Sequence, residues 1–174
     1  VITNEETHEK TGFGYDDLFP VLAIVDPELM LTVPPKFTAY QGFDALFHSV
    51  EGYVSKWVNL MSDMYAITAI ENVARTLAKT VKDGKNIDAR EKVAFGNTLS
   101  GTVMCVGCCT SQHSLEHAMS AYHQQLPHGA GLIMISRAYF THLISKHVCD
   151  DRFIRMAKAM GMEDAKEPMD FIKM

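Results

Sequence analysis

The sequence predicts a mainly α-helical protein, an all-helical bundle-like domain preceded by two short strands. Apolar residues recur at i, i+3, i+4 and i+7 over most of the chain that follows Pro34-Pro35. The helical segments are joined by short connections that carry helix start and stop residues, which is typical of helix bundles. We find strand-like runs only before residue 34.

The first 33 residues differ from the rest of the chain. Residues 1–3 and 21–25 are β-branched runs bounded by turn residues. The second run is apolar at consecutive positions, as in a strand buried on both faces of a parallel sheet. Two strands cannot complete such a sheet. We therefore interpret residues 1–33 as the remnant of an N-terminal α/β domain and residues 34–174 as the helical domain.

The helical domain is predicted to contain a series of helices in the order of the chain. The first spans about 37–55, where Phe43, Phe47 and Val50 lie on one apolar stripe. We expect Ser62-Asp63 to cap the second helix and Gly84 to end it. The later helices are predicted at about 88–108, 111–123, 129–146 and 150–161. Residues 169–174 resemble the start of another helix, so we expect the chain to be a piece of a longer protein.

The composition excludes several classes of function. The chain is 47% apolar and 21% charged, which is ordinary for a globular protein. Its formal net charge is −5 and its basic residues are scattered, so we expect no nucleic-acid partner. No apolar run is long enough to span a membrane, and we see no secretion signal. We therefore expect a cytoplasmic protein that does not enter membranes.

Three of the four cysteines are crowded at Cys105, Cys108 and Cys109. A secreted disulfide framework would space them more widely, so we interpret them as reduced thiols. The simplest interpretation is that they are small buried residues on a crowded helix. They could also form half of a zinc site, but the sequence contains no second pair of cysteines to complete one.

Two parts of the sequence contain residues suited to metal binding. Asp44 and His48 are four residues apart on a predicted helix, so their side chains share one face beside apolar neighbours. Four of the eight histidines lie in a second, short segment. These four are His113, His117, His123 and His128.

Each of these residues also has a simpler explanation. A single helical histidine is more often a hydrogen-bonded residue than a ligand, and the Asp44–His48 pair could be a helix-surface interaction. The metal interpretation gains weight because both groups lie on apolar stripes and His128 lies in a Pro-His-Gly turn. One carboxylate with three imidazoles suits a divalent ion such as Fe(II) or Zn(II).

The motifs resemble those of the iron-containing (group III) alcohol dehydrogenases. The resemblance rests on the Asp44-x-x-x-His48 segment, on His113-x-x-x-His117, and on Pro127-His128-Gly129, in that order. It implies that Asp44, His48, His113 and His128 are metal ligands. It also implies that His117 lies near the substrate as a candidate for proton transfer, and that Lys10 lies near the dinucleotide.

The resemblance further implies a dehydroquinate-synthase-like fold, of which this chain would be the C-terminal half. The implied activity is reversible oxidation of a small alcohol to an aldehyde or ketone, with NAD or NADP as cofactor. We expect Fe2+ as the metal, with Zn2+ as the alternative, and a homodimer as the assembly. The Gly-rich phosphate loop of the family is absent from this sequence, so we expect the chain alone to be inactive.

Two other interpretations remain at this stage. The chain could be an isolated metal-binding helical domain with no activity of its own. It could also belong to a metal-dependent lyase of the dehydroquinate-synthase type. Such a lyase would need more basic residues for a phosphorylated substrate than this region contains.

Overall fold

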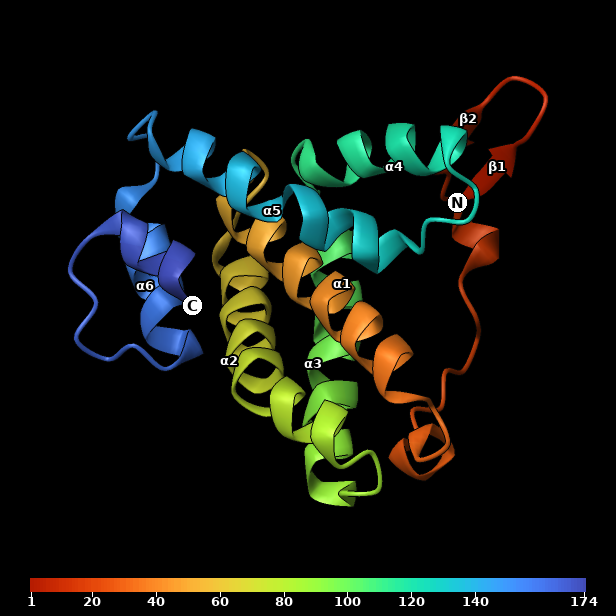
Figure 1. The fold of residues 1–174 in the computed structure, drawn as a ribbon, viewed down its shortest axis with the longest axis horizontal. Helices are drawn as coiled ribbons and strands as arrows, with labels where there is room; N and C mark the ends of the chain where they lie inside the picture. The colour runs from red at the N-terminus through yellow and green to blue at the C-terminus, as the bar shows by residue number, and fades with distance from the viewer.

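The computed structural model describes residues 1–174, and it is mainly helical (Figure 1). None of its helices has both the length and the apolar character needed to span a membrane. The strands are β1 (Ile2–Asn4) and β2 (Glu9–Thr11). The α-helices are α1 (Pro35–Val54), α2 (Leu60–Lys82), α3 (Ile87–Val106), α4 (Gln112–Tyr122), α5 (His128–Ile144) and α6 (Asp150–Met160). Short 3₁₀ helices are η1 (Asp16–Leu18), η2 (Pro27–Met30) and η3 (Pro168–Lys173).

The predicted helices are confirmed, with small differences at their ends. The cap of α2 is Asn59 and not Ser62-Asp63, because the Asn59 side chain accepts hydrogen bonds from the backbone N–H groups of Met61 and Ser62. The Ser62 hydroxyl in turn accepts from the backbone N–H of Asn59, which completes a capping box. The helix expected at 169–174 is the 3₁₀ helix η3.

The strand prediction is correct for the first run and wrong for the second. Strand β1 pairs with β2 as an antiparallel hairpin, with Ile2 opposite Thr11. Residues 21–25 form no strand, and Val21, Leu22 and Ile24 are exposed. A strand needs a neighbour for its backbone hydrogen bonds, and the only sheet of this structure is the two-stranded hairpin of β1 and β2.

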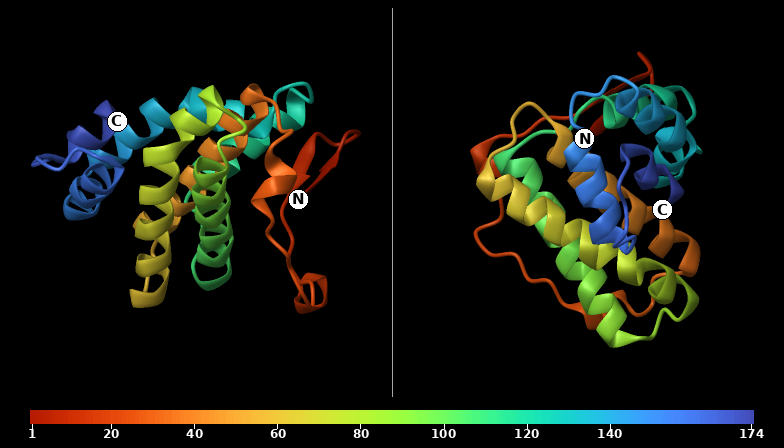
Figure 2. Two further views of the ribbon diagram at one scale, coloured as in Figure 1. Left: turned by 90° about the horizontal axis from the view of Figure 1, so that it is seen from below. Right: turned by 90° about the vertical axis from the view of Figure 1, so that its left-hand side faces the viewer.

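The main core lies where α1, α2 and α3 meet. Helices α2 and α3 stand side by side, and α1 packs across both of them (Figure 2). Val50 of α1, Ile70 and Val73 of α2 and Val103 of α3 are fully buried there. Burying one such side chain contributes about 1.5–3 kcal/mol, so this junction fixes the position of α1.

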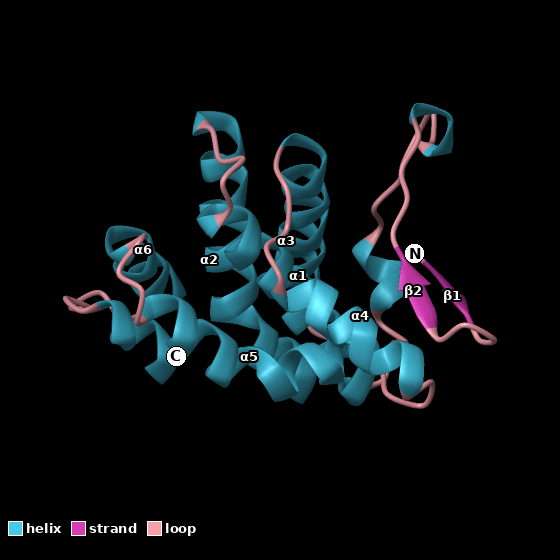
Figure 3. Cartoon of the chain, turned by 90° about the horizontal axis from the view of Figure 1, so that it is seen from above, coloured by secondary structure: helices cyan, strands magenta, loops and turns pink.

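An aromatic cluster attaches α5 and the C-terminal elements to α1. The ring of Phe140 in α5 lies 5.9 Å from that of Phe47 in α1 and 5.4 Å from that of Phe171 in η3. Phe153 of α6 packs 5.3 Å from Phe171. The hairpin lies at the opposite end of the molecule, beside α4 (Figure 3). Helix α5 packs on both α1 and α4, between the aromatic cluster and the hairpin.

Candidate metal centre

The four residues predicted as metal ligands come together around one carboxylate oxygen. The Nε2 atom of His113 lies 3.2 Å from Oδ1 of Asp44. The Nε2 atoms of His48 and His128 each lie 3.4 Å from the same oxygen. The structure thus brings residues of α1, α4 and α5 to one point.

These distances suit atoms that bind one metal ion. Two ligand atoms that each lie about 2.0–2.1 Å from the same ion are roughly 3–3.5 Å apart at adjacent coordination positions. Donor atoms of Asp44, His113 and His128 all lie within 4.8 Å of one another. The Nε2 atom of His48 is close to this group because it lies 3.4 Å from Oδ1 of Asp44. The His48 ring also stacks on the ring of His113, with centroids 3.9 Å apart. A carboxylate with imidazoles is the donor set that Fe(II) and Zn(II) accept, so the residues fit such an ion.

The local structure explains how the side chains reach this point. Asp44 and His48 are one helical turn apart on α1, so their side chains lie one above the other. His128 is the first residue of α5, directly after Pro127. A Cβ atom on Gly129 would lie 2.2 Å from the carbonyl oxygen of Tyr40, so only glycine lets α5 begin directly on the backbone of α1.

Each of the three imidazoles has a separate partner for its other ring nitrogen. Nδ1 of His113 is hydrogen-bonded to Oε1 of Glu51, and Nδ1 of His128 to Oε2 of Glu116. Both glutamates are fully buried. Histidines that bind metals usually donate the second ring N–H to such a carboxylate, which leaves the Nε2 lone pair free to bind the ion.

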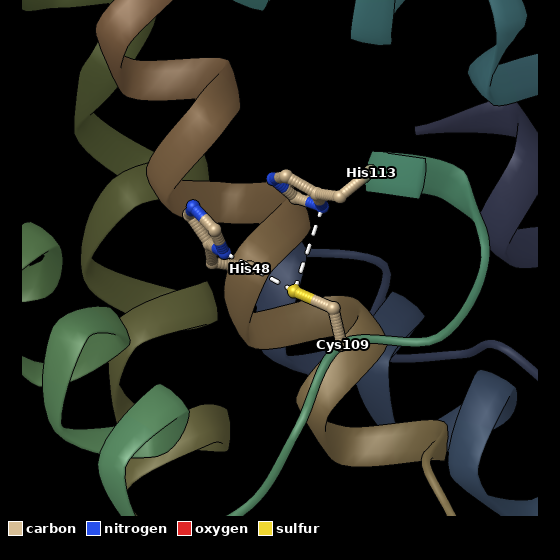
Figure 4. A group of neighbouring side chains, drawn as sticks. All are labelled: His48, Cys109 and His113. Atoms are coloured by element: carbon tan, nitrogen blue, oxygen red, sulfur yellow. Dashed lines mark hydrogen bonds between the residues drawn. The ribbon is translucent and has the colours of Figure 1, made fainter. Parts of the chain in front are cut away.

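The partner of His48 is a thiol. Sγ of Cys109 lies 3.3 Å from Nδ1 of His48 and 3.6 Å from Nδ1 of His113 (Figure 4). Donor atoms of His48, Cys109 and His113 also lie within 4.8 Å of one another, on the side of the rings that faces away from Asp44. Burial raises the pKa of the Cys109 thiol, so it is protonated at neutral pH.

The interpretation of the crowded cysteines as buried residues is wrong for two of them. All four cysteines are free, and Cys105 and Cys108 are exposed while Cys109 is partly buried. Helix α3 ends at Val106, so Cys108 and Cys109 lie in the connection to α4 and not inside a crowded helix.

The charges at the site are strongly coupled. Burial opposes ionisation of Asp44, but hydrogen bonds with His113 and His128 outweigh it and hold the pKa of Asp44 well below its usual range. Burial alone would lower the pKa of His113, but its bonds to Asp44, Cys109 and Glu51 raise that pKa to about 11. Burial, and then the charge of His113, lower the pKa of His48 to about 4.

His117 borders the same hollow as the four predicted ligands. This hollow has a volume of about 430 Å³. The ring of His117 lies 5.4 Å from that of His128. Burial, followed by the charges of His128 and Lys10, lowers the pKa of His117, so its imidazole is neutral at pH 7. A neutral imidazole beside the hollow can accept a proton.

Lys10 contacts α4. Its Nζ atom donates a hydrogen bond of 2.9 Å to Oγ of Ser120 and lies 3.8 Å from Oε2 of Glu116. Lys10 borders a second hollow, of about 420 Å³, between the hairpin and α4. The two hollows adjoin at Gly12, Ser114 and His117. The predicted role of Lys10 at a dinucleotide stays a prediction.

Three residues of the site were not predicted from the sequence to act there: Glu51, Glu116 and Cys109. A signal for Glu51 exists, because it lies on α1 three residues after His48 and next to the buried Val50. Glu116 has a weaker signal, three residues after His113 on α4. Histidines that bind metals usually donate a hydrogen bond to a carboxylate. An acidic residue on the same helix face as a candidate ligand is therefore a signal, and both glutamates satisfy it. No signal in the sequence places Cys109 beside His48.

Comparison with known proteins gives consistent matches. The sequence model of the family described as "Fe-containing alcohol dehydrogenase family, C-terminal" matches residues 38–173. The 1,3-propanediol dehydrogenase of Citrobacter freundii is 34% identical over 162 residues, which are 92% of this chain and 41% of that protein. The NAD-dependent methanol dehydrogenase of Bacillus methanolicus is 32% identical, over 92% of this chain and 42% of that protein.

Solved structures agree with the sequence matches. An archaeal halo-thermophilic alcohol dehydrogenase from a Red Sea brine pool superposes with a TM-score of 0.92 at 33% identity, covering 99% of this chain and 45% of that one. Sulfoacetaldehyde reductase from Bifidobacterium kashiwanohense, solved in complex with NAD+, gives a TM-score of 0.83 at 30% identity, with the same coverage. The chain thus spans less than half the length of these relatives.

Proposed function

Because this chain belongs to the iron-containing alcohol dehydrogenase family, we propose that it provides the metal-binding half of an NAD(P)-linked alcohol dehydrogenase. One observation supports this most directly: three imidazole Nε2 atoms lie 3.2–3.4 Å from a single carboxylate oxygen. We propose Asp44, His48, His113 and His128 as the ligands of Fe2+, with Zn2+ as the alternative ion.

The residues around the hollow would perform separate tasks in alcohol oxidation. When bound, the divalent ion would supply Lewis-acid polarisation of the alcohol oxygen, and the dinucleotide would accept a hydride. Asp44, His48, His113 and His128 would hold the ion at the hollow that they border, where the alcohol would bind. His117, neutral at pH 7, accepts the alcohol proton at one ring nitrogen and passes it to solvent.

The relatives support a small alcohol or aldehyde as the substrate. Two of them are named for methanol and 1,3-propanediol, and one for sulfoacetaldehyde. A hollow of about 430 Å³ accommodates molecules of this size. One relative is named as NAD-dependent and another was solved with NAD+, which supports a nicotinamide dinucleotide as cofactor.

A second candidate function is metal binding without turnover by this chain alone. This candidate is favoured because the chain spans only 41–45% of the length of the four relatives described above. Loading the chain with Fe2+ under anaerobic conditions, adding NADH and a small aldehyde, and following loss of the reduced cofactor separates the two. Turnover supports a complete site, whereas metal binding without turnover supports the second candidate. Failure to bind Fe2+ or Zn2+ would contradict both.

Metal uptake should release a proton. In the metal-free protein the raised pKa of His113, about 11, keeps it protonated at neutral pH. A ligand histidine must be neutral, so binding displaces this proton, and the apparent affinity should rise by at least about tenfold per pH unit between roughly pH 7 and pH 10, because the pKa of His128 is raised as well. Calorimetric titration with Zn2+ in two buffers of different ionisation enthalpy would measure the proton released. An affinity that is independent of pH would contradict this assignment of His113.

A further inference from the structure

Glu116 is a buried carboxylate of α4 that contacts residues of two other elements. Its side chain is fully buried on α4. Its Oε2 atom is hydrogen-bonded to Nδ1 of His128 on α5 and lies 3.8 Å from Nζ of Lys10 on β2. Burying a carboxylate is costly unless it is paired or hydrogen-bonded, so these two contacts account for its presence in the interior.

The packing around Glu116 is too close for a larger neighbour. A Cβ atom on Gly131 would lie 2.8 Å from both Cγ and Oε1 of Glu116. Gly131 lies three residues after His128, on the same face of the first turn of α5. The Glu116 carboxyl therefore lies directly beneath the turn that carries the His128 imidazole.

Glu116 and the other buried glutamate of the site, Glu51, differ in the hydrogen bonds that they accept besides those from histidines. The Glu51 carboxylate accepts hydrogen bonds from the Thr110 hydroxyl and from the backbone N–H groups of Gln112 and His113, and so it also fixes the start of α4. No backbone N–H donates to Glu116, and no donor of the protein reaches its Oε1 atom. Its contacts are with side chains, namely His128, Lys10 and Ser120, and His128 is the proposed metal ligand among them.

We propose that Glu116 is a positioning residue of the metal centre, which holds the His128 imidazole with Nδ1 protonated and Nε2 facing Asp44. This inference rests on the proposed metal-binding function. An imidazole that binds a metal must present a lone pair, and a fixed acceptor for the proton on the other nitrogen decides which nitrogen that is. Loss of such an acceptor typically costs 10–100-fold in metal affinity.

The test compares Glu116→Gln and Glu116→Ala with the unchanged chain, using Co2+ as the metal and its visible absorption as the signal. Both variants should bind Co2+ about 10–100-fold more weakly. Alanine should cost more than glutamine, because the glutamine carbonyl still accepts a hydrogen bond from Nδ1. The control is Glu71→Gln, since Glu71 is exposed on α2 and should leave Co2+ binding unchanged.

A second readout separates positioning from a purely structural role. In the unchanged chain the ¹⁵N signals of the His128 ring should report a protonated Nδ1 when Zn2+ is bound, and Glu116→Ala should alter the Co2+ absorption spectrum. If Glu116 were only structural, Glu116→Gln would lower the melting temperature while affinity and spectrum stayed the same, and that result would overturn the inference. The proposed function would survive it. If the unchanged chain bound no Co2+ or Zn2+, the proposed function itself would fail, and the inference with it.

Discussion

Replacing His128 with alanine is expected to weaken binding of a divalent ion by on the order of a hundredfold or more. A structural zinc site contributes about 10–16 kcal/mol, so each of four ligands accounts for about 3 kcal/mol, which corresponds to a hundredfold change in Kd. Nε2 of His128 lies 3.4 Å from Oδ1 of Asp44, and the two atoms would bind the same ion. The substitution therefore removes one of the proposed ligands. Metal content after dialysis, together with titration of the metal-free chain with Zn2+, would measure the effect.

The matched control for this variant is His123→Ala. His123 lies at the end of α4, in the segment that leads to His128, and it is exposed. Its removal should leave metal content unchanged. Full metal retention in the His128 variant, or equal losses in the two variants, would contradict the proposed ligand set.

Replacing Phe140 with alanine is expected to destabilise the protein by about 3–5 kcal/mol. Phe140 is 1% exposed and its ring packs against Phe47, Phe153 and Phe171. The substitution would leave a cavity between α1, α5, α6 and η3 that rigid helices cannot fill. Since domains are stable by about 5–15 kcal/mol, the loss is a large fraction of the total. Chemical denaturation monitored by circular dichroism would measure the free energy of unfolding.

Phe95→Ala is the control for the cavity. Phe95 also lies on a helix, α3, but its side chain is 48% exposed. Its removal should cost well under half as much as the loss of Phe140. A loss at Phe140 no larger than that at Phe95 would show that the aromatic cluster does not fix the C-terminal elements to α1.

Features set by neighbours along the chain could be predicted from the sequence. The pairing of Asp44 with His48 follows from helix geometry alone, because residues four apart share a helix face. The helices themselves follow from the apolar stripes, and their ends from residues such as Gly161, which adopts a φ of 124° after α6.

Features set by distant parts of the chain could not be predicted. Glu51 and His113 are 62 residues apart, and their contact depends on where the first turn of α4 lies relative to α1. The same holds for the contact of Cys109 with His48. The error at residues 21–25 has a related cause, because β-branched composition indicates a preference for extended backbone but provides no partner strand.

The distance along the chain between the proposed ligands has a consequence for the unfolded state. Asp44 and His113 are 69 residues apart. When the chain unfolds, donor atoms so far apart in the sequence separate and the ion is released. The free energy of metal binding therefore adds to the free energy of unfolding. Chelation should therefore lower the melting temperature even though every apolar contact in the core stays in place.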